Sequence, residues 1–172
     1  MVRYYNRYPN KSTIFWILPL VHSKDAKMKR FMFCLICLLL VVGGRALAEE
    51  ADAVVGEWYT KDSKALVQVY KADNVYSGKI VWLKEPKNDD GSEKLDTNNP
   101  DESKQGNPII GLNLVDGFVY KGKNKWADGT IYDPDNGKTY SCKMKLNEDN
   151  TLKVRGFIGI SLIGRTQVWT RK

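Results

Sequence analysis

From residue 54 onward the sequence repeats one pattern, in which short runs of alternating apolar and polar residues end at turn-forming residues. In residues 138–146, for example, Cys142 and Met144 alternate with Lys143 and Lys145. A period of two is typical of strands with one buried and one exposed face. The pattern predicts eight strands, at residues 54–60, 65–71, 75–84, 109–120, 125–132, 138–146, 151–158 and 163–171.

Most connections between these segments are short enough for hairpins, so neighbouring strands should be antiparallel. Residues 133–137 read Asp-Pro-Asp-Asn-Gly, a composition typical of tight turns. One-sided alternation over eight strands favours an all-β, antiparallel up-and-down barrel, which leaves no exposed sheet edge. An open sandwich is the alternative. We expect residues 49–172 to form this single domain, with one long loop at residues 85–108.

The segment before the barrel has the features of an export signal. A basic cluster at residues 27–30 precedes an apolar run over residues 31–42 and then Ala46-Leu47-Ala48. This order predicts a cleavable signal peptide at residues 28–48, with a retained membrane anchor as the alternative. Because the signal begins at Met28, we expect residues 1–27 to be a disordered extension or to precede the true start of translation. The mature protein should be periplasmic or extracellular, without stable membrane insertion.

Removing residues 1–48 changes the chemistry available to the chain. Eight of the 27 Lys and Arg residues and one of the 20 acidic residues lie there, so residues 49–172 carry 19 of each and are neutral. A neutral domain is a poor partner for nucleic acid. His22, Cys34 and Cys37 are also removed, leaving Cys142 and no His. Nucleophile–His pairs and His/Cys metal sites are therefore excluded, and we expect no enzyme activity, metal or cofactor.

Two ends of the barrel segment carry a resemblance. Gly56-Glu57-Trp58 opens the first strand, and Arg165, Trp169 and Arg171 lie in the last. This arrangement resembles the calycin barrels of lipocalins and fatty-acid-binding proteins. The resemblance implies that Gly56 and Trp58 belong to the barrel floor, with Arg171 or Arg165 lying across the indole as a cation–π partner.

A second resemblance covers most of residues 54–171. Residues 78–82 (Gly-Lys-Ile-Val-Trp), 98–101 (Asn-Asn-Pro-Asp), 108–111 (Pro-Ile-Ile-Gly), 131–134 (Ile-Tyr-Asp-Pro) and 164–166 (Gly-Arg-Thr), with Trp126 and Gly129, resemble the secreted bacterial family designated DUF2147. The resemblance implies the compartment and the fold. It implies no catalytic residue, because no activity is attached to the family.

Aromatic residues are the first candidates for a binding site. They could line a pocket for a small apolar or amphipathic molecule, although a filled barrel core is the alternative. Arg165 and Gln167 share a strand face with Trp169 and could orient a polar head group. The candidate ligand-binding residues are Trp82, Trp126, Tyr132, Tyr140, Arg165 and Gln167. We therefore expect a non-enzymatic ligand-binding protein, with a His-free enzyme using Asp, Tyr or Arg, or an envelope protein-interaction module, as alternatives.

The long loop at residues 85–108 is the remaining candidate. Its length predicts a functional segment that folds over the barrel mouth. Residues 96–101 carry several oxygen-bearing side chains that could hold Ca²⁺, but the ligand spacing of an EF-hand is absent and Asn, Asp and Pro are common in turns. We interpret these residues as a turn.

Overall fold

The computed structural model describes residues 49–172. The signal peptide predicted at residues 28–48 and the extension predicted at residues 1–27 lie outside these residues. No helix within residues 49–172 is both long and apolar enough to cross a bilayer.

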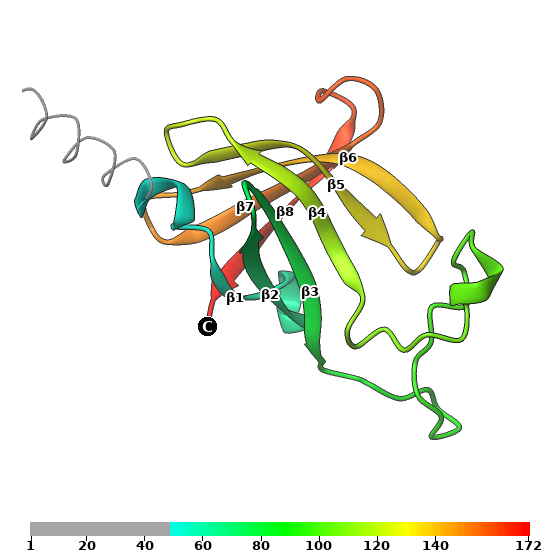
Figure 1. Cartoon of the computed structure of the whole chain (residues 1–172). Helices are drawn as coiled ribbons and strands as arrows, with labels where there is room; N and C mark the ends of the chain where they lie inside the picture. The colour runs from blue at the N-terminus through cyan, green and yellow to red at the C-terminus, as the bar shows by residue number, and fades with distance from the viewer. Residues whose placement is uncertain (1–48) are drawn as a thin grey trace, which may run out of the picture. The chain divides into compact units, whose positions relative to one another are not determined.

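Eight antiparallel strands close into one barrel in sequence order, as predicted (Figure 1). The ring closes where β1 pairs with β8, with Trp58 opposite Arg171. The strands are β1 (Gly56–Tyr59), β2 (Ala65–Ala72), β3 (Val75–Leu83), β4 (Asn113–Tyr120), β5 (Lys125–Asp133), β6 (Lys138–Leu146), β7 (Thr151–Phe157) and β8 (Gly164–Arg171). Two 3₁₀ turns, η1 (Lys61–Ser63) and η2 (Glu102–Lys104), lie in connections.

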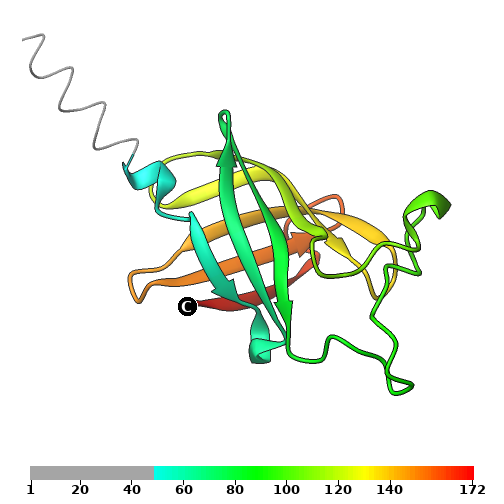
Figure 2. The same cartoon turned by 60° about the horizontal axis from the view of Figure 1, so that its bottom comes forward.

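Alternate connections of an up-and-down barrel lie at the same end, which gives this barrel two different ends. The closed end consists of the helical turn at residues 49–52 and the turns β2–β3, β4–β5 and β6–β7. The open end consists of η1, residues 84–112, the β5–β6 turn and the β7–β8 loop. In Figures 1 and 2 the N-terminal turn and residues 84–112 lie on opposite sides of the barrel.

The core is concentrated at the closed end. Trp58, Trp126, Phe118 and Leu152 are fully buried. The Trp126 ring lies 6.3 Å from Tyr76 and 5.3 Å from Tyr120, measured between ring centroids. These large side chains fill one half of the barrel and leave the other half to smaller residues. Cys142 is also buried, which raises the pKa of its thiol to about 12 and makes it unreactive at neutral pH.

A β-bulge interrupts β3 near its end. Leu66 and Val67 are adjacent in β2, but their partners in β3 are Trp82 and Ile80, so Val81 is an extra residue. Because strand side chains alternate between faces, one extra residue reverses the facing of those that follow. Ile80 is buried, whereas Trp82 is 42% exposed.

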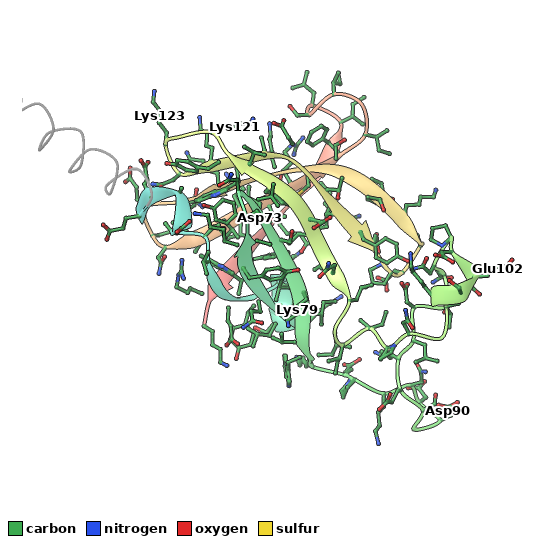
Figure 3. All side chains as sticks on the ribbon, viewed as in Figure 1. Asp73, Lys79, Asp90, Glu102, Lys121 and Lys123 are labelled. Carbon is green, nitrogen blue, oxygen red and sulfur yellow. The ribbon has the colours of Figure 1, made fainter. Side chains whose placement is uncertain are left out.

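The long loop has structure of its own. Lys87 pairs with Glu93 and Leu95 pairs with Pro108 in isolated bridges. The loop projects from the open end beside the β5–β6 turn, and Figure 3 shows Asp90 and Glu102 on its far side. It lengthens one side of the barrel mouth, whereas the sequence predicted that it would fold over the mouth.

Candidate ligand-binding site

The open half of the barrel contains a cavity of about 1840 Å³ that widens to solvent at the mouth. The part of the cavity nearest the closed end is bounded by the buried residues Ile80, Val154 and Trp169 and the half-buried Ile131 and Leu114. Apolar walls of this kind suit the hydrocarbon part of a ligand. The barrel is therefore packed in its closed half and hollow in its open half. The sequence left a filled core and a ligand pocket as alternatives, and each of them describes one half.

The cavity keeps its width because β7 carries a glycine on its inner face. Gly156 pairs with Cys142 and Arg165 and lines the cavity. A Cβ atom there would lie 3.1 Å from the Ile131 side chain. At Gly129, by contrast, the space above the backbone is filled by Phe118, 2.4 Å from an ideal Cβ position. Gly129 therefore belongs to the packed half of the barrel.

Polar groups lie above the apolar walls. Gln167 is half-buried on the inner face of β8, and its side-chain oxygen accepts a hydrogen bond of 3.2 Å from the Trp169 indole. Arg165 is exposed one step nearer the mouth and also lines the cavity. Tyr140 faces them from β6, and its hydroxyl accepts a hydrogen bond of 3.2 Å from Asn136. The cavity is thus apolar below and polar at its rim.

Two of the aromatic residues predicted for this site lie elsewhere. The bulge at Val81 turns Trp82 to the outer surface, where it packs edge-on against Tyr59 at 6.2 Å between ring centroids. Trp126 follows the β4–β5 turn and therefore lies at the closed end. Its indole donates a hydrogen bond of 3.1 Å to the Ala51 carbonyl. Neither ring lines the cavity.

Tyr132 contributes to the rim through a different interaction. Its hydroxyl donates a hydrogen bond of 2.7 Å to Asp96 of the long loop, and the other Asp96 oxygen accepts one of 2.6 Å from Asn99. Asp96 is fully buried. Burial, followed by the hydrogen bond to Asp96, raises the pKa of Tyr132 to about 12. One Asp96 oxygen thus fixes the long loop to β5 through Tyr132, and the other binds Asn99 within the loop itself.

Asn98 extends the same attachment. Its side-chain amide donates to the carbonyls of Pro134 and Asp135, at 3.0 and 3.2 Å. Gly137 completes the turn with φ of +67°, and an added Cβ would collide with the Asn98 carbonyl. The composition of residues 96–101 and 133–137 predicted two turns, but not that these turns bind each other.

At the opposite end, Arg171 lies across Trp58, with the guanidinium carbon 4.2 Å from the ring centroid. The guanidinium also donates to the carbonyls of Ala53 (2.6 Å) and Val55 (3.2 Å) and to Asn150 (3.1 Å). Gly56 allows this approach, since a Cβ there would lie 2.8 Å from an Arg171 nitrogen. Of the two arginines that the sequence offered, Arg171 occupies this position and Arg165 lines the cavity.

Several cavity residues were not singled out from the sequence. Alternation grouped Ile80, Val154 and Trp169 with other residues on one face of their strands, but it gave no assignment for Ile131. Within residues 49–172, no group of three or more His, Cys, Asp or Glu side chains is placed to hold a metal ion.

Comparison with known proteins gives one family and one solved structure. The model of the DUF2147 family, described as an uncharacterized protein conserved in bacteria, matches residues 56–171. The structure of HP1028 from Helicobacter pylori, which is described as belonging to the lipocalin family, matches with a TM-score of 0.61 and 20% identity. The match covers 69% of this chain and 82% of that one, and at this identity it establishes the fold alone. No curated protein matches the sequence.

Proposed function

Because this chain belongs to the DUF2147 family of bacterial proteins and folds as a lipocalin-like barrel, we propose that it is an exported protein that binds a small amphipathic molecule in its open half. The observation that carries the proposal is the cavity of about 1840 Å³, apolar at its base and polar at its rim. The hydrocarbon part of the ligand lies against Ile131, Val154 and Trp169. Its polar head lies beside Arg165 and Gln167.

Burial of hydrocarbon drives this binding. Each apolar Å² removed from water contributes about 25 cal/mol, and association consumes part of the gain. At about 0.8 kcal/mol per buried CH2, a twelve-carbon chain contributes about 10 kcal/mol before the cost of association is deducted. Arg165 adds selectivity for an anionic head, because a guanidinium binds carboxylate and phosphate with paired hydrogen bonds.

The cavity is tested by filling it. We expect dodecanoate to bind residues 49–172 in isothermal titration calorimetry, and Gln167→Phe to weaken binding at least tenfold, about 1.4 kcal/mol. The adjacent Val168 is 45% exposed on the outer face of the same strand, so Val168→Phe is the matched control. Equal affinities for the two variants, or no binding to the unsubstituted protein, would contradict the proposal.

Arg165 is tested by changing the head group of the probe. Arg165→Gln should weaken the binding of dodecanoate and leave that of dodecanol nearly unchanged, since only the carboxylate uses the guanidinium. An equal loss for both probes would show that Arg165 shapes the cavity and does not select the head.

A second candidate is an enzyme that uses Asp and Tyr without His. The observation in its favour is the fully buried Asp96 beside Tyr132, which lines the cavity rim. The raised pKa of Tyr132 disfavours proton transfer from its hydroxyl at neutral pH. If Asp96→Asn abolished turnover of an ester or lactone substrate by a protein that kept its dodecanoate affinity, the enzyme would be favoured.

A further inference from the structure

The β7–β8 loop exposes an unusual amount of apolar surface. Residues 158–163 read Ile-Gly-Ile-Ser-Leu-Ile. Four of these side chains are exposed: Ile158 by 67%, Ile160 by 60%, Leu162 by 84% and Ile163 by 67%. Single exposed aliphatic residues are common on protein surfaces, but a contiguous group marks a site of interaction.

The loop is held in this exposed form by Arg155. The arginine donates to the carbonyls of Ser161 (2.8 Å) and Leu162 (3.1 Å) and to the Thr166 hydroxyl (2.7 Å). Because these carbonyls turn toward Arg155, the side chains of the loop project outward, as the upper right of Figure 3 shows. The hydrogen bonds from Arg155 to the two carbonyls also reduce the cost of moving the loop out of water.

The wall below the loop is basic. Residues 138–146 and 151–172, which make up β6, β7 and β8 with the β7–β8 loop, contain no acidic residue. Their exposed outer side chains include Lys143, Lys145 and Lys153. The acidic residues nearest to these lysines along the chain, Glu148 and Asp149, lie in the β6–β7 turn at the closed end, and the strands of the wall themselves carry only positive charge.

Like charges also face each other directly on this wall. Lys143 lies opposite Arg155, and Lys145 lies opposite both Lys153 and Lys125 on the neighbouring strands. Like charges in such cross-strand positions are destabilising. Among the described residues none of these five forms a salt bridge, so the repulsion is not relieved within the barrel.

We propose that the β6–β7 wall and the β7–β8 loop together form a docking surface for an anionic lipid bilayer. Lysine and arginine side chains attract acidic head groups, and the aliphatic loop enters the interfacial region. Nucleic acid would satisfy the charges but not the four aliphatic side chains, which lack the aromatic rings that stack on bases. The partner that fits both features is a membrane surface.

Docking would place the cavity beside the lipid. Ile158 and Ile163 line the cavity and also belong to the exposed loop, so the rim is apolar on the side of this loop and polar at Arg165 and Tyr140. An amphipathic ligand could therefore move between bilayer and barrel without crossing water. This consequence rests on the proposed function, whereas docking itself does not.

The test is cosedimentation of residues 49–172 with lipid vesicles. This part of the chain includes the whole closed barrel and its core, and it excludes the apolar run of the predicted signal. We expect binding to vesicles of phosphatidylcholine and phosphatidylglycerol at 3:1, at least tenfold stronger than to phosphatidylcholine alone. Ile160→Asp with Leu162→Asp, and separately Lys145→Glu with Lys153→Glu, should each weaken binding at least tenfold.

The control reverses the same number of charges elsewhere. Lys79 lies on β3, on the other side of the eight-stranded ring from β7, and Lys87 lies in the long loop. Lys79→Glu with Lys87→Glu should leave vesicle binding within twofold of the unsubstituted protein. Circular dichroism verifies that every variant keeps the barrel.

Three results would overturn the docking proposal. These are no sedimentation with anionic vesicles, equal loss in the control variant, or a dimer in light scattering that the loop variant dissociates without any change in vesicle binding. Dodecanoate titration without vesicles is independent of these measurements. A protein that binds vesicles but not dodecanoate would retain the docking surface and lose the proposed function.

Discussion

Arg171 connects three separate parts of the closed end through one side chain. It covers Trp58 and binds the backbone that precedes β1 and the turn between β6 and β7. Hydrogen bonds from a charged donor are worth about 1.5–3 kcal/mol each, and a desolvated cation–π contact about 2 kcal/mol, although such terms do not add. A single residue can therefore account for a large share of the stability of this end.

We expect Arg171→Ala to lower the free energy of unfolding by about 2–4 kcal/mol, measured by urea denaturation. Arg171→Lys should recover only part of the loss, because an ammonium cannot bind three acceptors in a planar fork. Loss of less than 0.5 kcal/mol in the alanine variant would show that the contacts are not stabilising.

Gly56→Ala provides a coupled measurement. Its φ of +139° is unfavourable for alanine, and its Cβ would also displace Arg171. The substitution should therefore be less destabilising when Arg171 is already alanine. Additive effects of the two changes would mean that the methyl group does not touch the guanidinium.

Single residues also show where sequence reasoning succeeded and where it did not. Alternation placed Arg165 and Gln167 on the face of Trp169, and the assignment holds because β8 pairs with β7 without a register shift. The resemblance to calycin barrels placed Trp58 in the barrel floor. The prediction that Trp82 lines the pocket was wrong, because the bulge at Val81 contains no glycine that would indicate it in the sequence. The prediction for Trp126 was wrong because this residue follows the β4–β5 turn, and in an up-and-down barrel that turn lies at the end opposite the long β3–β4 connection. Asp96 lies in a segment whose composition indicated only a turn, so its burial was not predictable.

At the scale of elements, the N-terminal turn acts as a plug for the closed end. Ala51 accepts from the Trp126 indole, and Asp52 accepts from Lys71 (2.7 Å) and from the Tyr76 hydroxyl (2.6 Å). The hydrogen bond from Lys71, followed by that from Tyr76, lowers the pKa of Asp52. This contribution to stability is present above the carboxyl's ordinary pKa and disappears as the pH falls through the lowered value.

Removing residues 49–53 should lower Tm by roughly 10 °C relative to a chain that begins at residue 49, since about 3 kcal/mol of contacts are lost in a domain of this size. Differential scanning calorimetry measures the change. An unchanged Tm would mean that the turn rests on the barrel without stabilising it.

The long loop depends on a second such attachment, which responds to alkaline pH. Tyr132 holds its proton more tightly in the folded protein, with a pKa of about 12 against an ordinary value of 10. The stabilisation is therefore complete below about pH 10 and is lost as the pH rises toward 12. Tyr132→Phe should show a shallower loss of stability than the unsubstituted protein between pH 10 and 11.5, in urea titrations at each pH. Parallel curves would contradict the assigned contact.

At the scale of the whole molecule, the barrel divides into a packed half and an open half. The eight strands, their order and most of their bounds followed from periodicity and turn residues, because both are local properties of the sequence. The cavity was not predictable in the same way. Its volume depends on which inner positions are small, as at Gly156, and on whether a neighbour fills the space, as Phe118 does at Gly129.

Ligand binding should be visible in global stability. At a free dodecanoate concentration 100 times its Kd, the free energy of unfolding should rise by about 2.7 kcal/mol, because the ligand binds only the folded barrel. Chemical denaturation with and without the probe measures this, with Gln167→Phe as the variant that should not respond. A rise of equal size in that variant would place the binding site outside the cavity.

The geometry of the closed end has a practical consequence for handling the protein. Residue 49 begins the plug, and Lys172, which follows the last residue of β8, donates a hydrogen bond of 2.8 Å to Glu57. Both ends of the barrel chain therefore emerge on the side away from the cavity mouth. A tether attached at either one would hold the molecule on a sensor chip with its mouth and β7–β8 loop facing the flowing sample, ready to meet ligands or captured vesicles.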